Sequence, residues 1–100
     1  MSTKFELAVW KACAKIPKGK VSTYAQIAKA IKNPKAARAV GNALNKNPHA
    51  PKVPCHRVVQ SNGIIGGFAH GTNRKTAMLR KEGIEIQNKK VKLSKFLYKF

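Results

Sequence analysis

The chain has 100 residues, of which 43% are hydrophobic, and a formal net charge of +18 that comes from 21 Lys and Arg residues against three acids. This length fits one compact domain with a modest core, and the charge favours a polyanionic partner, because each phosphate that a cation neutralises releases counterions. A ribosomal or chaperone-like basic protein would use the same charge without further chemistry, and an anionic membrane surface is a weaker alternative.

The first predicted element is a helix from Lys4 to Lys15. Thr3 and Glu6 fit a capping box at its start, and apolar residues recur at helical spacing through the range. Cys13 lies on this apolar stripe, so we interpret it as a buried, inert thiol. The following Pro17-Lys18-Gly19-Lys20 ends the helix and turns the chain.

A short second helix follows from the sequence around Tyr24. Thr23 and Gln26 fit another capping box, which places Tyr24 in the first turn, near the positive end of the helix. Asn33-Pro34 breaks this helix and leads into the next one. The two helices and the turn between them therefore form a helix-turn-helix candidate.

The helix expected after this turn, from Lys35 to Asn45, has an unusual surface. One long cation, Arg38, projects from among small side chains. The small residues are Ala36, Ala37, Ala39, Gly41 and Ala43. Small side chains let a helix approach another surface closely, and an arginine there could fill the space of a displaced base. Taken alone, however, the pattern favours a solvated charge on a helix of good helix formers.

The stretch with the most candidate catalytic side chains is Pro54-Cys55-His56-Arg57, at the end of a proline-rich connector that begins at Asn47. Prolines stiffen the connector and hold Cys55 in a defined place. A thiolate is the nucleophilic form of cysteine, and neighbouring His and Arg lower the free energy of its charge. His56 is the nearest base, and Glu82 or Glu85 could orient it, because Glu6 is engaged at the first helix.

Several reaction classes use such a thiol. A cysteine protease would leave the high positive charge unexplained, and a disulfide oxidoreductase usually carries a C-x-x-C pair, which this chain lacks. A nucleophilic thiol beside a DNA-binding helix pair instead suggests attack on the alkyl carbon of a damaged base.

After the tetrad we expect a short strand or the start of a helix from Arg57 to Gln60, followed by a turn at Ser61-Asn62-Gly63. The glycine-rich stretch 64–71 allows the backbone to approach a ligand closely. It lacks the G-x-x-x-x-G-K-[ST] pattern, so a nucleotide phosphate site is not expected there.

A last clear helix is expected from about Asn73 to Lys81, with Gly83 at its end. Ala77 and Met78 or Leu79 would face the core. The lysine-rich tail, residues 87–100, fits either a packed hairpin or helix, or an arm that contacts phosphate.

The sequence shows no signal peptide and no apolar run of membrane-spanning length, so we expect a cytoplasmic protein with free thiols. The histidines have no metal-ligand spacing, so no zinc site is expected.

Together these segments resemble the O6-alkylguanine-DNA alkyltransferases, also known as methylated-DNA–protein-cysteine methyltransferases. The likeness covers roughly Phe5 to Gly83. It rests on Pro54 to Val58 as the active-site signature, Val21 to Ile27 as the helix with the family tyrosine, Asn33 to Gly41 as the recognition helix, and the spacings of Asn47-Pro48 and Glu82-Gly83.

The resemblance implies a mainly α fold, in which a small helical domain carries a winged-helix-like helix-turn-helix and a short hairpin or strands near the active site. Residues 1–86 would form the catalytic and DNA-binding domain, and residues 87–100 a basic tail packed on it or extending it. Members of the family usually carry an N-terminal domain that has no counterpart here.

The resemblance also implies catalytic roles. Cys55 would accept the alkyl group irreversibly, His56 would draw the thiol proton through a water, and Glu82 would orient His56. Asn47 would shape the active-site turn, and Tyr24 would hydrogen-bond guanine N3 as the base leaves.

For DNA, the resemblance implies that Arg38 fills the space left by a flipped base while the small residues of its helix lie against the minor groove. Ala36 and Ala37 belong to that surface, and Asn33 and Ser61 would contact phosphate. The guanine pocket would be lined by Val58, Gly66, Phe68 and Ala69. Phe68 stands where some relatives have tyrosine, so a hydroxyl contact is lost while stacking survives.

The implied function is direct, single-turnover DNA repair by transfer of a methyl or other alkyl group from O6 of guanine, with O4 of thymine as a further candidate. It needs no cofactor and no metal, and the partner is double-stranded DNA bound by a monomer, with no membrane. The alternative is an alkyltransferase-like protein that binds alkylated DNA and signals to another repair pathway. Such proteins typically replace the cysteine, so Cys55 favours transfer.

Overall fold

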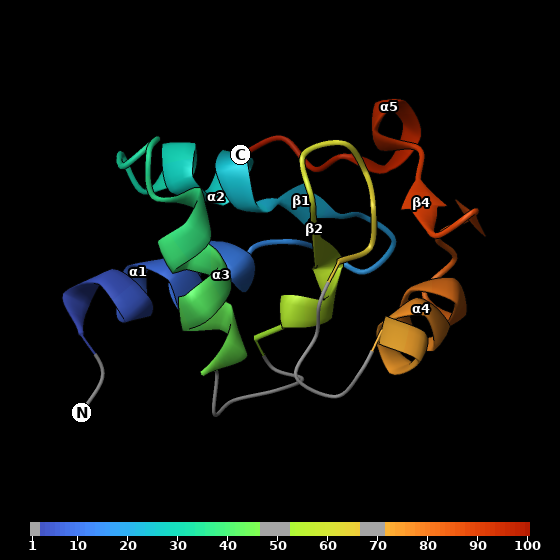
Figure 1. Cartoon of the computed structure of the whole chain (residues 1–100), viewed down its shortest axis with the longest axis horizontal. Helices are drawn as coiled ribbons and strands as arrows, with labels where there is room; N and C mark the ends of the chain where they lie inside the picture. The colour runs from blue at the N-terminus through green and yellow to red at the C-terminus, as the bar shows by residue number, and fades with distance from the viewer. Residues whose placement is uncertain (1–2, 47–52, 67–71) are drawn as a thin grey trace.

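The computed structural model describes residues 3–46, 53–66 and 72–100, and it is mainly helical with short strands, which confirms the expected fold class (Figure 1). The elements in chain order are α1 (Lys4–Cys13), β1 (Ser22–Thr23), α2 (Tyr24–Ala30), α3 (Ala37–Asn45), the 3-10 turn η1 (Cys55–Arg57), β2 (Val58–Val59), α4 (Thr72–Lys81), β3 (Ile86–Gln87), β4 (Lys90–Val91) and α5 (Leu93–Phe96). Within the described residues, no helix has both the length and the apolar character needed to cross a membrane.

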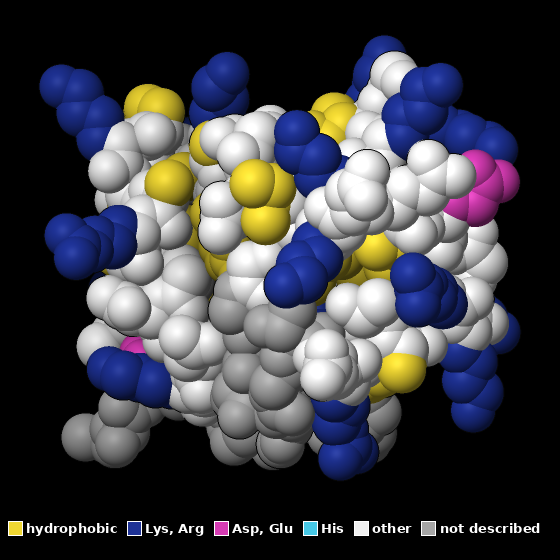
Figure 2. Space-filling view, turned by 45° about the vertical axis from the view of Figure 1, so that its right-hand side comes forward, with side chains coloured by type: hydrophobic (Ala, Val, Ile, Leu, Met, Phe, Trp, Pro, Cys, Tyr) yellow, Lys and Arg dark blue, Asp and Glu magenta, His cyan; other side chains and the backbone are white. Residues whose placement is uncertain are grey.

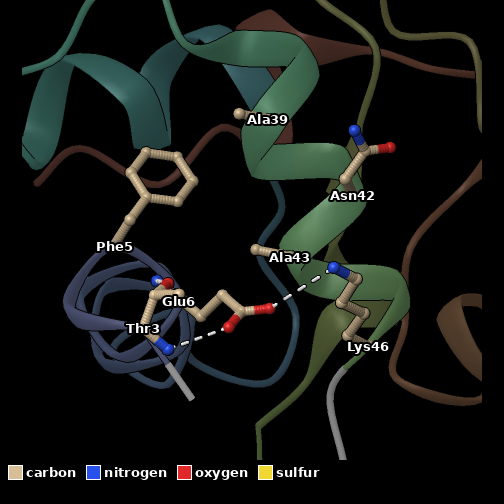
Figure 3. Close-up of a pocket in the computed structure, with 7 residues that line it drawn as sticks. All are labelled: Thr3, Phe5, Glu6, Ala39, Asn42, Ala43 and Lys46. Carbon is tan, nitrogen blue, oxygen red and sulfur yellow. Dashed lines mark hydrogen bonds and ion pairs between the residues drawn. The ribbon is translucent and has the colours of Figure 1, made fainter. Parts of the chain in front are cut away.

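Helix α1 begins as the sequence predicts. The Glu6 amide donates to Thr3 Oγ1 at 3.0 Å, and the Thr3 amide donates to Glu6 Oε1 at 2.9 Å, which completes the capping box. The Glu6 carboxylate also lies 3.9 Å from Lys46 Nζ, beyond the end of α3 (Figure 3). The helix ends at Cys13 rather than Lys15, because the amides of Lys15 and Ile16 bond three residues back, at 3.1 and 3.0 Å.

Helix α2 has half of the expected capping box. Thr23 Oγ1 accepts from the Gln26 amide at 3.0 Å, so Tyr24 is the first helical residue, as predicted. The Gln26 side chain does not return to the cap. It accepts from the Ser22 hydroxyl at 2.6 Å and donates to the Tyr98 carbonyl at 2.7 Å, because these partners from β1 and the tail lie beside it.

The turn between α2 and α3 is longer than the sequence suggested. The Asn33 amide bonds the Ala28 carbonyl at 2.9 Å around Lys32, whose φ is 63°, and the Ala36 amide bonds the Asn33 carbonyl at 3.0 Å. These bonds form a separate turn, so α3 starts at Ala37 rather than Lys35. Val40 and Leu44 are buried, as expected, and anchor α3 to the core.

The core has two parts. One lies among α1, α2 and α3, where the Trp10 indole N–H donates to the Ala43 carbonyl at 2.8 Å. The other joins β2, α4 and the C-terminal elements, and includes Val91 and Phe96 from the tail. The tail also bonds the first strand region: the Val21 amide donates to the Phe96 carbonyl at 2.9 Å, and the Tyr98 amide donates to the Val21 carbonyl at 2.7 Å.

Helix α4 differs from expectation in the face that it buries. Leu79 is fully buried, Met78 is half-buried, and Ala77, expected to face inward, is exposed. Lys75, four residues before Leu79, is buried instead. Gly83, with φ of +91°, follows the helix as predicted, and the Ile84 amide closes the end by bonding the Leu79 carbonyl at 3.0 Å.

Candidate active site

Cys55 lies at the start of the turn η1, directly after Pro54. The Cys55 amide bonds the Val53 carbonyl and the Arg57 amide bonds the Pro54 carbonyl, both at 2.9 Å, so the backbone around the thiol is fixed on both sides. Strand β2 follows and pairs in parallel with β1, with Val58 opposite Ser22 and Val59 opposite Thr23. Because Tyr24 directly follows β1, the thiol and the phenol are attached to the same small sheet.

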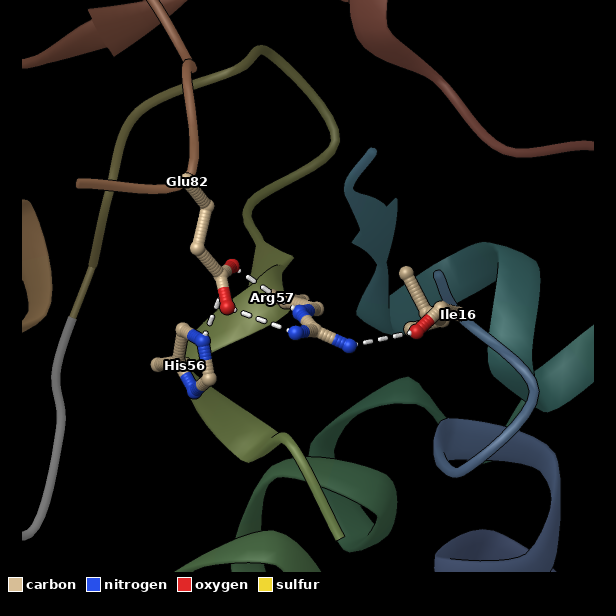
Figure 4. A network of polar contacts seen from close by, with 4 residues as sticks. All are labelled: Ile16, His56, Arg57 and Glu82. Atoms are coloured by element: carbon tan, nitrogen blue, oxygen red, sulfur yellow. Dashed lines mark hydrogen bonds and ion pairs between the residues drawn. The ribbon is translucent and has the colours of Figure 1, made fainter. Parts of the chain in front are cut away.

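A polar network fixes the residue after Cys55 (Figure 4). His56 is 3% exposed, and its Nε2 lies 3.1 Å from Glu82 Oε1. Arg57 donates to both oxygens of the same carboxylate, from Nε at 2.9 Å and from Nη2 at 2.6 Å, and its Nη1 donates to the Ile16 carbonyl at 2.8 Å. Arg57 therefore clamps Glu82, and Glu82 holds His56, so a segment after α4 and the loop after α1 support the turn that carries the thiol.

The network sets the charges of its members. Burial lowers the pKa of His56 below its usual value, even though the Glu82 carboxylate acts to raise it. Burial acts to raise the pKa of Glu82, but hydrogen bonds from Arg57 and His56 leave it below the usual value. At neutral pH the pair is thus a neutral imidazole and a carboxylate. In this assignment Nε2–H donates to Glu82 and Nδ1 is an acceptor, which can take a proton.

Lys75 is a site residue that the sequence reasoning missed. It is 0% exposed, and its ammonium lies 5.8 Å from the centre of the Tyr24 ring. Burial lowers the pKa of Lys75 to about 8, while the nearby thiols of Cys55 and Cys13 act to raise it. No sequence signal identifies it, because a lysine on a helix with many charged neighbours is ordinarily read as solvated.

Two of the groups near Lys75, the Cys13 thiol and the Tyr24 hydroxyl, are not ionised at neutral pH. Burial, with a smaller contribution from Cys55, raises the pKa of Cys13 to about 12, and Cys13 is 0% exposed, as expected for an inert thiol. Burial also raises the pKa of Tyr24, with smaller contributions from Cys55 and Cys13, so its hydroxyl keeps its proton and can donate it in a hydrogen bond.

A cavity of about 400 Å³ brings together four of the predicted site residues from separate segments. These are Tyr24, Ala37, Arg38 and Ser61, and the lining is completed by Ala25, Gly41 and Gln60. A Cβ added at Gly41 would lie 3.8 Å from the Tyr24 ring, so the small residues of α3 allow close approach between this helix and the phenol. Gln60 was not anticipated as a lining residue.

The other predicted residues that the structure describes, Cys55 among them, do not line this cavity. Asn33 is exposed and Ala36 is half-buried, both in the turn before α3. Val58 is fully buried within the core. Gly66 packs beside Gln60, since a Cβ on Gly66 would lie 3.2 Å from Gln60 Nε2. Asn47, Phe68 and Ala69 fall outside the described residues.

The surface around the site is strongly basic. Lys and Arg side chains project around the face in Figure 2, and Arg38 is exposed. The acids are engaged: Glu82 in the network, Glu6 at the start of α1, and Glu85 with Lys95 at 3.1 Å. Among the described residues, the Cys55 thiol thus lies on a well-fixed turn of a protein whose positive field attracts anions.

Comparison with known protein families gives a match over residues 4–84 to the family described as 6-O-methylguanine DNA methyltransferase, DNA binding domain. A methylated-DNA–protein-cysteine methyltransferase of Methanosarcina acetivorans is 52% identical over 81 residues, which cover 81% of this chain and 52% of the relative. The inducible enzyme of that name from Bacillus subtilis is 47% identical over 77 residues, 77% of this chain and 43% of the relative. The chain thus spans about half the length of these curated relatives.

Two solved structures extend the comparison. The OGT of Mycobacterium tuberculosis in complex with DNA aligns with a TM-score of 0.80 and 48% identity, over 82% of this chain and 51% of that chain. The S. pombe protein Atl1, in complex with damaged DNA containing O6-carboxymethylguanine, aligns with a TM-score of 0.86 and 36% identity, over 100% of both chains.

Proposed function

The chain belongs to the O6-methylguanine DNA methyltransferase family, and from this membership we propose that it repairs DNA by moving an alkyl group from O6 of guanine to Cys55. The observation that carries the proposal is the network in which His56, next to Cys55, is held by Glu82 and Arg57. O4 of alkylated thymine is a further candidate substrate, because it presents the same alkyl–oxygen bond.

The reaction balances without a cofactor. His56 takes the thiol proton of Cys55, through a bridging water, and Glu82 stabilises the charge that forms on the imidazole. The sulfur attacks the alkyl carbon in line with the carbon–O6 bond, which breaks and leaves its electron pair on guanine. Guanine regains one proton, and Cys55 remains as an alkyl thioether. The transfer consumes the protein, since nothing regenerates the thiol.

Tyr24 acts on the leaving base, and Lys75 acts on the attacking sulfur. The Tyr24 hydroxyl donates to guanine N3 as negative charge develops on the leaving base. The Lys75 ammonium, which is buried and lies close to the Tyr24 ring, stabilises negative charge on the Cys55 sulfur before transfer.

DNA binding follows from the cavity around Arg38. Arg38 fills the stack where the flipped base was, and the small residues of α3 let the helix lie in the minor groove. Ala36 and Ala37 belong to this surface, while Asn33 and Ser61 contact phosphate. The protein acts as a monomer on the duplex.

Five further residues complete the proposed site. Asn47 shapes the turn that carries Cys55, and the guanine pocket is formed by Gly66, Phe68 and Ala69. Val58 supports the pocket from within the core, because its side chain is fully buried.

A second candidate function is lesion binding without transfer. It is favoured by the similarity to Atl1, which was solved in complex with damaged DNA containing O6-carboxymethylguanine. Cys55 and its network argue for transfer, because a binding protein has no use for an activated thiol.

Mass spectrometry after incubation with O6-methylguanine DNA separates the two functions. We expect one methyl group on Cys55, present in Cys13→Ser and absent in Cys55→Ala. Tight lesion binding with an unchanged mass would establish the second function instead. Arg38→Ala should slow repair of duplex DNA far more than reaction with a free guanine analogue, and equal losses would contradict the role in base flipping.

A further inference from the structure

A second groove of about 430 Å³ lies between α1 and the end of α2. It is lined by Ala8, Lys11, Ala12, Lys15, Ala30, Ile31, Lys32 and Phe100. We refer to it as the lysine-rimmed groove. It shares no lining residue with the cavity around Tyr24 and Arg38, so its chemistry is separate from that of the repair site.

The groove lies on a different face of α1 from the one that contacts α3. Glu6 and Trp10 reach α3, through Lys46 and the Ala43 carbonyl. At 3.6 residues per turn, the lining residues Ala8 and Lys11 lie about 100° or more around α1 from these two positions, and Lys15 follows the end of the helix. A partner in the groove would therefore leave the proposed DNA surface of α3 open.

The floor of the groove is apolar and partly open to solvent. Phe100 is 45% exposed and Ile31 is half-buried, with three alanines between the lysines. Leu7, 54% exposed, lies one turn before Lys11 on the same helical row. Leu7 and Phe100 are the large hydrophobic side chains exposed in the described part of the chain, and both lie at or beside this groove.

The rim of the groove is cationic, and no acidic side chain lines it. Lys11, Lys15 and Lys32 form no ion pair among the described residues. The three acids of the chain are engaged elsewhere, by the α1 cap, the His56 network and Lys95. None of the side chains that line the groove is therefore a carboxylate that would neutralise its rim.

We propose that the lysine-rimmed groove docks an acidic, amphipathic peptide segment of a partner protein. Carboxylates of the peptide meet the three lysines, and an apolar side chain of the peptide covers Phe100 and Ile31. Such a helix presents acidic and apolar residues at spacings of three and four, which matches a narrow apolar floor between cations. Nucleic acid fits less well, because the floor is mainly aliphatic and offers one aromatic face for stacking.

Fluorescence anisotropy tests this with a labelled peptide that has Glu on one helical face and Leu and Phe on the other. The control peptide has the same composition in scrambled order. The double variant Lys11→Glu/Lys15→Glu should weaken binding at least tenfold. The matched variant Lys90→Glu/Lys92→Glu makes the same charge change at exposed positions outside the groove and should stay within threefold. Phe100→Ala should also weaken binding, and melting curves confirm that each variant is folded.

Four results would overturn the proposal. Equal losses in the two double variants, or equal binding of the scrambled peptide, would show attraction by net charge alone. Displacement of the peptide by unmodified duplex DNA would place it on the DNA surface. Tighter binding of a single-stranded thymidine oligomer than of the peptide, lost in Lys11→Glu/Lys15→Glu, would assign the groove to nucleic acid. The test uses protein whose Cys55 is not alkylated, and it contains no alkylated DNA. Its outcome is therefore independent of the proposed repair activity.

Discussion

Replacing Glu82 with Gln tests the network that supports the active-site turn. Glu82 is 14% exposed in its side chain and accepts three hydrogen bonds, one from His56 and two from Arg57. Gln keeps the shape but loses the charge, and its amide NH2 must face one of the donors. Hydrogen bonds to charged groups contribute about 1.5–3 kcal/mol each, and at least one is lost. We expect Glu82→Gln to lower the free energy of unfolding by about 2–3 kcal/mol.

Glu85→Gln is a matched control three residues away. The Glu85 side chain is 70% exposed and pairs with Lys95 at the surface, where such pairs contribute about 0–1 kcal/mol. In a domain of this size a loss of 1 kcal/mol lowers Tm by roughly 4–8 °C. Glu82→Gln should therefore melt about 10–20 °C below the parent chain, and Glu85→Gln within a few degrees of it.

The same pair of variants tests catalysis at a temperature where both are folded. Without the carboxylate that orients His56, transfer of the methyl group from DNA should slow by about a hundredfold or more. The rate is measured by quenched-flow transfer of labelled methyl to protein under single-turnover conditions. If Glu82→Gln matched Glu85→Gln in both Tm and rate, the network would have neither role and the reasoning from its geometry would be wrong.

Other predictions concern backbone, pH and the buried lysine. Gly63→Ala should lower the free energy of unfolding by about 3 kcal/mol or more, since its Cβ would lie 2.5 Å from the Val91 carbonyl oxygen at φ of +88°. Gly83→Ala, with open space at φ of +91°, should lower it by about 1–2 kcal/mol, and urea unfolding measures both. Because burial lowers the pKa of His56, the unfolded chain binds more protons below about pH 6.5, so stability should fall as pH is lowered through this range. A His56→Asn variant should flatten that part of the stability curve, and an unchanged slope would contradict the assignment. Lys75→Met should slow alkyl transfer by about tenfold or more, and the deficit should shrink above pH 8, where the lysine of the parent chain, with a pKa of about 8, loses its charge; a deficit constant from pH 6 to 10 would argue against an electrostatic role.

Local signals predicted much of this structure. The caps at Thr3 and Thr23 and the glycine that follows α4 depend on residues a few positions apart, and each is found where the sequence places it. The residues alone left Glu82 and Glu85 as candidate partners of His56. The family resemblance selected Glu82, because no local rule joins residues that are 26 positions apart.

The differences have long-range causes. Gln26 leaves its expected cap because the carbonyl of Tyr98, 72 positions away, lies within reach. Lys75 is buried where α4 packs against η1, with its ammonium over the Tyr24 ring, and lysine carries no signal for burial. Arg57 acts as scaffold, because it joins Glu82 to the Ile16 carbonyl, 41 positions away in the sequence.

The bond between the Trp10 indole and the Ala43 carbonyl makes the chain its own optical probe. Trp10 is the single tryptophan, is 6% exposed, and is held at 2.8 Å by the helix that also carries Arg38. Indole emission shifts with the polarity and hydrogen bonding of its surroundings. Any displacement of α3 as it docks on a partner should therefore change the emission of one buried fluorophore, so binding at this helix can be followed in real time without a label.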